Sequence, residues 1–277
     1  NSVSASRRKS LCTRHILHPV HQADGTIARI ATYWNERIHD LQMTDHPAGS
    51  LKFFDDLDEY RFDKLHYLPR VVDFTGYRDQ RLLEVGCGIG TDLLRFARGG
   101  ARVTGVDLAA RSVELAQANF ALHGVPDSAD LRVANGEALP FADETFDVVY
   151  AHGVLQYTAD PARMIEECGR VLKTGGEAIF MVYNRFSWLH ALSKVMSVGL
   201  EHEDAPVLRL FAMSEFRRLL AGFTESRIVP ERFPVPSRLH KGWKGALYNG
   251  LFVKVFAVVP HTLVRPLGWH LMAFCRK

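Results

Sequence analysis

The chain has 277 residues, of which 47% are hydrophobic and 23% charged, and its formal net charge is +3. These values are typical of a globular protein with a substantial core, and so weak a positive charge gives no argument for binding nucleic acid. Four widely separated cysteines, no signal-peptide pattern and no apolar run of about 18 residues argue against a disulfide framework and a membrane span, so we expect a cytoplasmic protein.

The first 25 residues are expected to form a disordered arm. Residues 1–23 contain serine and arginine but no acidic residue, a composition that does not favour a packed core. A transit peptide is an alternative that the pattern supports only in part. Cys12, His15, His18 and His21 are regularly spaced, but nothing around them predicts a closed zinc site, and we predict no metal anywhere in the chain.

Residues 26–75 follow a helical pattern in two segments, with apolar side chains at intervals of three and four. Strands and helices alternate after them, which indicates an α/β fold with a parallel sheet covered on both faces. Two further strands are expected near the end of the sequence, and the connection between them, 232–268, is too long for a simple turn. The predicted strands lie near 81–86, 102–107, 130–134, 146–151, 177–183, 225–231 and 269–275, and the predicted helices near 91–98, 110–122, 161–172 and 214–221.

The segment Leu82–Gly90 has the sequence LLEVGCGIG and joins the first strand to an amphipathic helix. Its three glycines let the backbone approach a ligand closely, and the helix N-terminus offers unpaired N–H groups. Asp107 ends the next apolar run, about twenty residues further on, where a carboxylate can hold a ribose diol. The pattern predicts binding of an adenosine-containing cofactor.

Further motifs follow in order: ANGEALPF at 134–141, FDVVYAH at 146–152, LQY at 155–157, DP at 160–161 and RVLKTGG at 170–176. With the glycine loop, they resemble the class I S-adenosylmethionine-dependent methyltransferases of small-molecule type over roughly residues 80–183. The resemblance implies a Rossmann-like doubly wound α/β fold with a seven-stranded sheet, mostly parallel with an antiparallel last strand, plus N-terminal helices and a late helical insertion. The expected division is an arm at 1–25, a helical lid at 26–75 and a methyltransferase domain at 76–277 with insertions near 188–212 and 232–268.

The resemblance also assigns the cofactor, S-adenosyl-L-methionine, with S-adenosyl-L-homocysteine as its product. Glu84 and the glycine loop would face the methionine and ribose, Asp107 the ribose hydroxyls and Leu108 the adenine. Asn135 stands where many relatives have an aspartate near the adenine amino group, and an amide oxygen can accept the same hydrogen bond. The cofactor set is Glu84, Gly86, Cys87, Gly88, Gly90, Asp107, Leu108, Asn135, Gly136, Glu137 and Ala151.

Methyl transfer from a sulfonium is an in-line displacement, so the protein mainly aligns the reactants and excludes water. A hydroxyl acceptor benefits from a base, and the candidate catalytic residues are His152 first, then Tyr157 and Tyr183. His152 is equally well interpreted as a histidine satisfied at a strand end, and the two tyrosines as core aromatics.

The lid is expected to contact the acceptor, with Arg61 or Lys64 meeting a carboxylate of the cofactor or substrate. For the lid aromatics, pinning the helices to the sheet is the slightly favoured alternative. The candidate substrate-binding residues are Tyr33, Trp34, Tyr60, Arg61, Lys64 and His190.

The fourth strand is followed by AHGV, which lacks the Asn/Asp-Pro-Pro-aromatic and Pro-Cys signatures of methyltransferases that act on bases. A small molecule bearing an O, N or S nucleophile is therefore favoured over nucleic acid. A protein or RNA methyltransferase, a non-catalytic cofactor-binding module and an NAD-linked oxidoreductase are the alternatives. The segment 240–268 mixes aromatic, aliphatic and lysine residues, and a substrate lid is favoured there over a homodimer surface or peripheral membrane contact.

Overall fold

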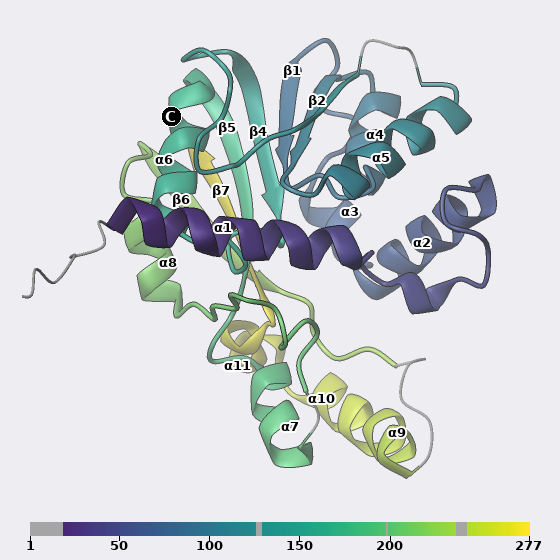
Figure 1. Cartoon of the computed structure of the whole chain (residues 1–277). Helices are drawn as coiled ribbons and strands as arrows, with labels where there is room; N and C mark the ends of the chain where they lie inside the picture. Colours follow the sequence, from purple (N-terminus) through teal and green to yellow (C-terminus); the bar gives the residue numbers. More distant parts are fainter. Residues whose placement is uncertain (1–18, 126–128, 198, 237–242) are drawn as a thin grey trace, which may run out of the picture.

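Seven strands form one sheet in the computed structural model, which describes residues 19–125, 129–197, 199–236 and 243–277. The strand order is β3-β2-β1-β4-β5-β7-β6, and β7 runs in the direction opposite to the other six strands (Figure 1). The predicted fold class is confirmed, including the antiparallel last strand. The strands are β1 (Arg81–Val85), β2 (Arg102–Asp107), β3 (Asp130–Val133), β4 (Phe146–His152), β5 (Leu172–Tyr183), β6 (Glu225–Glu231) and β7 (His270–Arg276).

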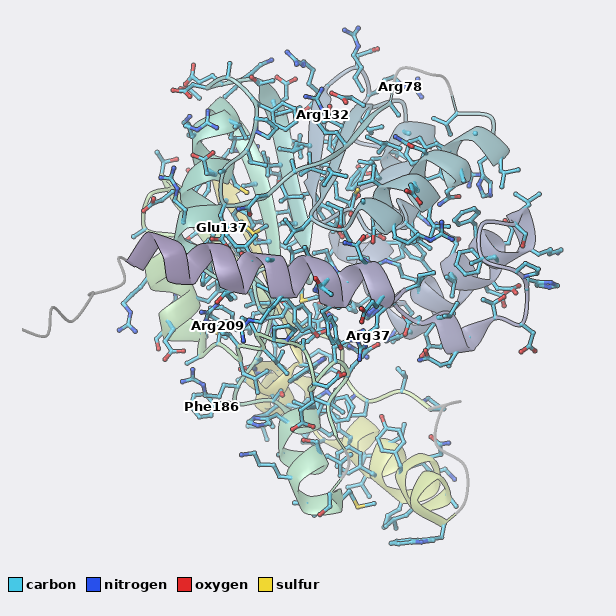
Figure 2. All side chains as sticks on the ribbon, in the orientation of Figure 1. Arg37, Arg78, Arg132, Glu137, Phe186 and Arg209 are labelled. Atoms are coloured by element: carbon cyan, nitrogen blue, oxygen red, sulfur yellow. The ribbon has the colours of Figure 1, made fainter. Side chains whose placement is uncertain are left out.

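The N-terminal part is helical, as the spacing predicted. Ser50 begins α2 by accepting a hydrogen bond from the Phe53 amide, a common helix N-cap. The expected disordered arm differs at its end, because α1 begins at Pro19, and the arm's first 18 residues, with Cys12, His15 and His18, lie outside the described residues. Figure 2 shows Arg37 just after α1, toward the middle of the molecule. These elements are α1 (Pro19–Glu36), η1 (Leu41–Met43), α2 (Leu51–Lys64) and α3 (Leu68–Val71).

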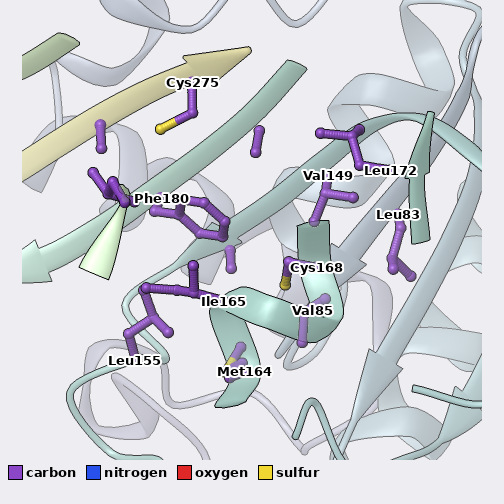
Figure 3. Packing of buried hydrophobic residues seen from close by; sticks show 14 of the residues in the cluster. Leu83, Val85, Val149, Leu155, Met164, Ile165, Cys168, Leu172, Phe180 and Cys275 are labelled. Atoms are coloured by element: carbon purple, nitrogen blue, oxygen red, sulfur yellow. The ribbon is translucent and has the colours of Figure 1, made fainter. Parts of the chain in front are cut away.

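The sheet is packed on both faces because its strands are apolar on both sides. Leu83 and Val149 face α6, whose Met164 and Ile165 fill the space against them (Figure 3). Alternate residues such as Leu82 face the other side, where α4 packs. Packing on both faces therefore fixes the central strands, including the residues at their carboxyl ends. The core helices are α4 (Thr91–Arg98), α5 (Ala110–Leu122), α6 (Pro161–Val171) and α8 (Met213–Leu219).

The late insertions form a group of short helices that extends away from the sheet, below α1 in Figure 1. We call this group the projecting helices and define it as residues 186–196 and 243–267. None of the described helices has the length and hydropathy needed to cross a membrane. The elements are α7 (Trp188–Met196), α9 (Trp243–Leu247), the π-helical turn η2 (Tyr248–Phe252), α10 (Val253–Val258), α11 (His261–Val264) and η3 (Arg265–Leu267).

Candidate active site

A cavity of about 240 Å³ lies at the carboxyl ends of the parallel strands, where α/β sheets bind their ligands. Most of the sequence-predicted site residues line it together. It also includes residues that sequence reasoning missed, among them Asp92, Met181, Glu201, Arg232 and His270. The predicted residues in its wall are Trp34, Arg61, Lys64, Glu84, Gly86, Cys87, Gly88, Asp107, Leu108, Asn135, Gly136, Glu137, His152, Tyr157 and Tyr183.

The glycine loop is anchored by Asp107 at the end of β2. One carboxylate oxygen accepts the Gly88 amide at 2.9 Å, and the other accepts the Ala109 amide at 2.9 Å. Gly86 has a positive φ of 73°, and a Cβ there would collide with Val154. Each Asp107 oxygen keeps a second lone pair, so the carboxylate can still accept ribose hydroxyls while it holds the loop.

Glu84 is buried at the end of β1, and its Oε2 has no hydrogen-bond partner within the described residues. Burial, and next the charge of Asp92, raise the pKa of this carboxyl well above its ordinary value. A ligand ammonium group would supply the missing partner and favour the charged form. S-adenosylmethionine carries such a group in its methionine portion, so this orphaned oxygen fits the predicted cofactor.

Asn135 and Glu137 line the cavity, and their side chains hold the local backbone in place. The Asn135 side-chain oxygen accepts the Glu137 amide at 3.0 Å, which fixes the turn after β3. The Glu137 carboxylate accepts the amides of Ala159 and Asp160 at 2.8 and 3.0 Å. The Glu137 side chain is therefore engaged by the turn before α6, which leaves its backbone to contact a ligand. In Figure 2 the Glu137 label lies just above the left part of α1.

Arg61 does reach a carboxylate, but the carboxylate belongs to the protein. Its Nε and Nη2 donate to Asp92 at 2.6 and 2.5 Å, and the Tyr150 hydroxyl donates to Asp92 at 2.8 Å. The Arg61 side chain is only 21% exposed, so its charge needs a partner, which Asp92 in the first turn of α4 supplies. The expected pairing with a cofactor or substrate carboxylate is therefore corrected for Arg61.

The same correction applies to the predicted pairing of Lys64 with a carboxylate of the cofactor or substrate, because its partners are carboxylates of the protein. Its Nζ lies 3.0 Å from Asp40 and 2.8 Å from Glu201. His39 and His202 lie beside this group, with ring nitrogens 2.8 Å apart. His39, Glu201 and His202 place their ligand atoms within 4.8 Å of one another, as metal ligands do, but Lys64 already neutralises the Glu201 carboxylate. The cluster fastens the N-terminal helices to the 200–204 loop.

A chain of side chains crosses the acceptor side of the cavity. His152 Nδ1 lies 3.3 Å from Arg61 Nη2, and His152 Nε2 lies 3.3 Å from the Tyr67 hydroxyl. The same hydroxyl lies 2.6 Å from His270 Nδ1, and His270 Nε2 lies 3.0 Å from Arg232 Nη1. Burial, and next the charge of Arg61, lower the pKa of His152 to about 3. Burial and Arg232 likewise lower the pKa of His270, so both rings are neutral near pH 7.

Tyr157 and Tyr183 form an aromatic wall next to this chain. Tyr183 stacks on Trp269 with ring centroids 4.5 Å apart, and Trp34 meets the edge of Tyr157 at 5.1 Å. Burial raises the pKa of Tyr183 to about 12 and that of Tyr157 above its ordinary value. Both phenols therefore stay protonated near neutral pH and can donate or accept hydrogen bonds as neutral groups.

Five predicted residues do not line the cavity. Ala151 faces the core on the side of β4 opposite His152, as strand alternation requires. The Tyr33 hydroxyl donates to Asp204 at 2.7 Å, which pins α1 to the 200–204 loop, whereas the alternative weighed for the lid aromatics was contact with the sheet. The other three are Gly90, which begins α4, Tyr60, whose ring lies 5.4 Å from the Lys64 ammonium, and His190, which sits on α7 and contacts the Arg185 carbonyl at 2.6 Å.

Comparison with known proteins places residues 83–180 in the family described as methyltransferase domain. A sterol 4-C-methyltransferase from Caenorhabditis elegans is 40% identical over 102 residues, 37% of this chain and 30% of that protein. A ubiquinone biosynthesis O-methyltransferase from Nitrosomonas europaea is 29% identical over 246 residues, 84% of this chain and 92% of that protein. The chain spans 30% and 44% of the length of two of the curated relatives that it matches.

Among solved structures, the geranyl diphosphate C-methyltransferase from Streptomyces coelicolor, in complex with Mg²⁺, geranyl diphosphate and S-adenosyl-L-homocysteine, has the same fold. The TM-score is 0.56, the identity is 18%, and the match covers 90% of this chain and 97% of that one. At this identity the likeness establishes the fold.

Proposed function

This chain carries a class I S-adenosylmethionine-dependent methyltransferase domain, and on that premise we propose that it transfers a methyl group in line onto an O, N or S nucleophile of a small molecule. The observation that carries the proposal is the single cavity in which the orphaned Glu84 carboxylate and the Asp107-anchored loop share a space with His152 and His270. A donor site and an acceptor site in one cavity are what an in-line transfer requires.

The names of the relatives support a small acceptor. The sterol, ubiquinone and geranyl diphosphate methyltransferases are named for small molecules, and none is named for a protein or a nucleic acid. The weak net charge of +3 agrees with this interpretation, because nucleic-acid enzymes present a strongly basic surface.

On the donor side, the cofactor supplies a methyl group already activated by a sulfonium. The chain's residues bind and orient it: Glu84 would accept the ammonium, Asp107 the ribose hydroxyls, and the glycine loop allows close backbone approach. The helices α1 and α2 cover the cavity, and the Arg61–Asp92 pair holds α2 against α4. This cover excludes water from the reacting atoms.

On the acceptor side, a neutral His152 is a weak base because its pKa lies near 3. Its two ring nitrogens face Arg61 and Tyr67 at 3.3 Å each, so the ring takes a proton from a substrate only if one of these long contacts opens. Of the two arginines that end this row of side chains, Arg61 is neutralised by Asp92, and Arg232 contacts the neutral ring of His270. This pattern supports acceptors that ionise readily or need no base, such as phenols, carboxylates, thiols and amines, over aliphatic alcohols.

Calorimetric titration with S-adenosylhomocysteine and with NAD tests the donor half of the proposal. We expect S-adenosylhomocysteine to bind and NAD not to bind. Binding of NAD alone would make the chain an oxidoreductase and would contradict the proposal.

A methyl-label assay with S-adenosylmethionine and pooled thiols, phenols, amines, carboxylates and alcohols tests the acceptor half. Label in one of the first four pools is the expected result. Label in added protein or RNA would favour the macromolecular alternative, and label confined to aliphatic alcohols would show that the acceptor side supplies a stronger base than its geometry indicates.

A further inference from the structure

The projecting helices carry an unusual amount of exposed apolar surface. Of the thirteen large hydrophobic side chains that are exposed among the described residues, nine belong to this group. Phe186 at its base is 65% exposed (Figure 2), and Trp243 at the start of α9 is 71% exposed. An apolar surface concentrated on one projection marks an interaction site.

Five of these side chains form one stripe along α9, η2 and α10: Trp243, Leu247, Leu251, Val255 and Val258. Four of them recur at intervals of four residues. In a regular α-helix this spacing drifts slowly around the axis, and the wider π-helical turn of η2 counteracts the drift. The stripe therefore stays on one side of the helices.

An adjacent side of the same helices is packed, at positions that each follow a stripe residue by one place, about 100° around the axis. Tyr248, Phe252 and Phe256 lie against Trp188 of α7, with ring centroids 6.2, 5.9 and 6.4 Å from the Trp188 ring. The aromatic side thus joins the projecting helices to each other, and the aliphatic stripe faces outward. None of the five stripe residues lines the cavity, which argues against the substrate-lid interpretation.

The charge of this region selects the partner. Acidic residues make up 31 of the 277 residues, yet none occurs at 186–196 or at 243–267, where Lys194, Lys244, Lys254 and Arg265 occur. An apolar stripe with a tryptophan, flanked only by basic residues, matches the interface of an anionic lipid bilayer. Two copies of this face would bring like charges together, which disfavours a homodimer here.

We propose that the projecting helices bind the surface of an anionic lipid membrane, with the stripe inserted among the acyl chains and the basic residues at the headgroups. The same helices touch the cavity wall, because Trp188 Nε1 donates to the Arg232 carbonyl at 2.8 Å and the Arg232 guanidinium lines the cavity. Resting on the proposed function, this geometry assigns the acceptor to the class of membrane-borne amphiphiles.

Vesicle flotation of the full chain tests the membrane surface without using activity. We expect binding to vesicles that contain phosphatidylglycerol, weaker binding at high salt, and little binding to phosphatidylcholine alone. Leu251→Asp should weaken the partition coefficient about tenfold or more, because it removes buried apolar area and adds a repelled charge. The matched control is Leu122→Asp, at a leucine that is 48% exposed on α5 and should leave binding unchanged.

Calorimetry with S-adenosylhomocysteine shows that each variant is folded and keeps failure of this proposal separate from failure of the donor site. Absence of vesicle binding by the parent chain would overturn the membrane surface, as would equal losses in the two variants. A concentration-dependent dimer in sedimentation that Leu251→Asp abolishes would also overturn it and identify a second copy as the occupant.

Discussion

Arg61 on α2 and Asp92 on α4 form a two-point ion pair, with N–O distances of 2.6 and 2.5 Å, beside the cavity. Burial alone would raise the pKa of Asp92, but the Arg61 guanidinium holds it below its ordinary value. The pair connects the covering helix to the first turn after the glycine loop. Neither partner can be removed without leaving a buried charge.

Arg61→Met should therefore destabilise the protein by about 3–5 kcal/mol, because it leaves Asp92 buried without its cation. Urea unfolding measures the loss. The matched control is Arg95→Met, whose pair with Asp58 has similar geometry at 3.1 and 2.6 Å but is about one-third exposed. That variant should lose roughly 1 kcal/mol. Equal losses would show that burial does not determine how much the Arg61 pair contributes to the free energy of unfolding. The double variant Arg61→Met, Asp92→Asn should recover part of the loss, because it also removes the unpaired charge.

Glu84→Gln should have opposite effects on the free and the bound protein. It removes a buried carboxylate with an unpartnered oxygen, so the unliganded protein should become more stable in urea. It also removes the charge that would accept the cofactor's ammonium, so the Kd for S-adenosylhomocysteine should rise about 10- to 100-fold. Glu114→Gln, at an exposed carboxylate on α5, is the control and should change neither quantity. Unchanged affinity in Glu84→Gln would remove Glu84 from the donor site.

Stability should fall on acidification below pH 6.5. The pKa of His152 is lowered to about 3 and that of His202 to about 4, in both cases first by burial. Above pH 6.5 these rings are neutral in both the folded and the unfolded state. As the pH falls from 6.5 toward 3, these two histidines bind protons in the unfolded chain but stay neutral in the folded protein. The free energy of unfolding therefore decreases across this window, by at most about 1.4 kcal/mol per pH unit for each ring.

His152→Gln should make the free energy of unfolding in urea decrease less steeply between pH 7 and 4, because it removes one of the rings whose pKa is lowered by folding. Replacement of the exposed His66 by glutamine should leave the slope as it is. An undiminished slope in His152→Gln would mean that the ring does bind a proton in the folded state.

Tyr67→Phe should separate the two halves of the cavity functionally. The hydroxyl connects His152 to His270 at 3.3 and 2.6 Å, and none of its contacts reaches the glycine loop. Affinity for S-adenosylhomocysteine should stay within about twofold, while the methyl-transfer rate to the acceptor found in the label assay falls roughly tenfold or more and its pH profile shifts. Tyr77→Phe, which removes a hydroxyl bonded to Glu177 at 3.2 Å, should alter neither. Weaker cofactor binding with an unchanged rate in Tyr67→Phe would place the hydroxyl on the donor side.

The donor side of the site was largely predictable because its parts are local. Glu84, Gly86, Gly88 and Asp107 belong to one contiguous strand–loop–helix–strand unit, in which β1 pairs with β2 and Asp107 accepts the Gly88 amide. Their types and spacing therefore carry most of the geometry. Strand positions were predictable for the same reason, since both faces of the sheet need apolar residues.

The acceptor side could not be predicted because its parts meet only in the folded chain. Tyr67 and His270 are 203 residues apart in sequence and touch at 2.6 Å, and no periodicity connects them. Arg61 shows the same limit: a carboxylate partner was predicted from the sequence, but not that this carboxylate belongs to Asp92. His190 was predicted to bind substrate, but it lies on α7 outside the cavity lining and contacts the Arg185 carbonyl.

The strand order also determines when the site can form. In the described sheet β7 separates β5 from β6, so β6 has no neighbour to pair with until residues 270–276 have been synthesised. His270 lies on that same strand. Closure of the sheet and assembly of the histidine chain are therefore one event during folding, and a nascent chain that stops short of β7 exposes unpaired edges on two strands to aggregation.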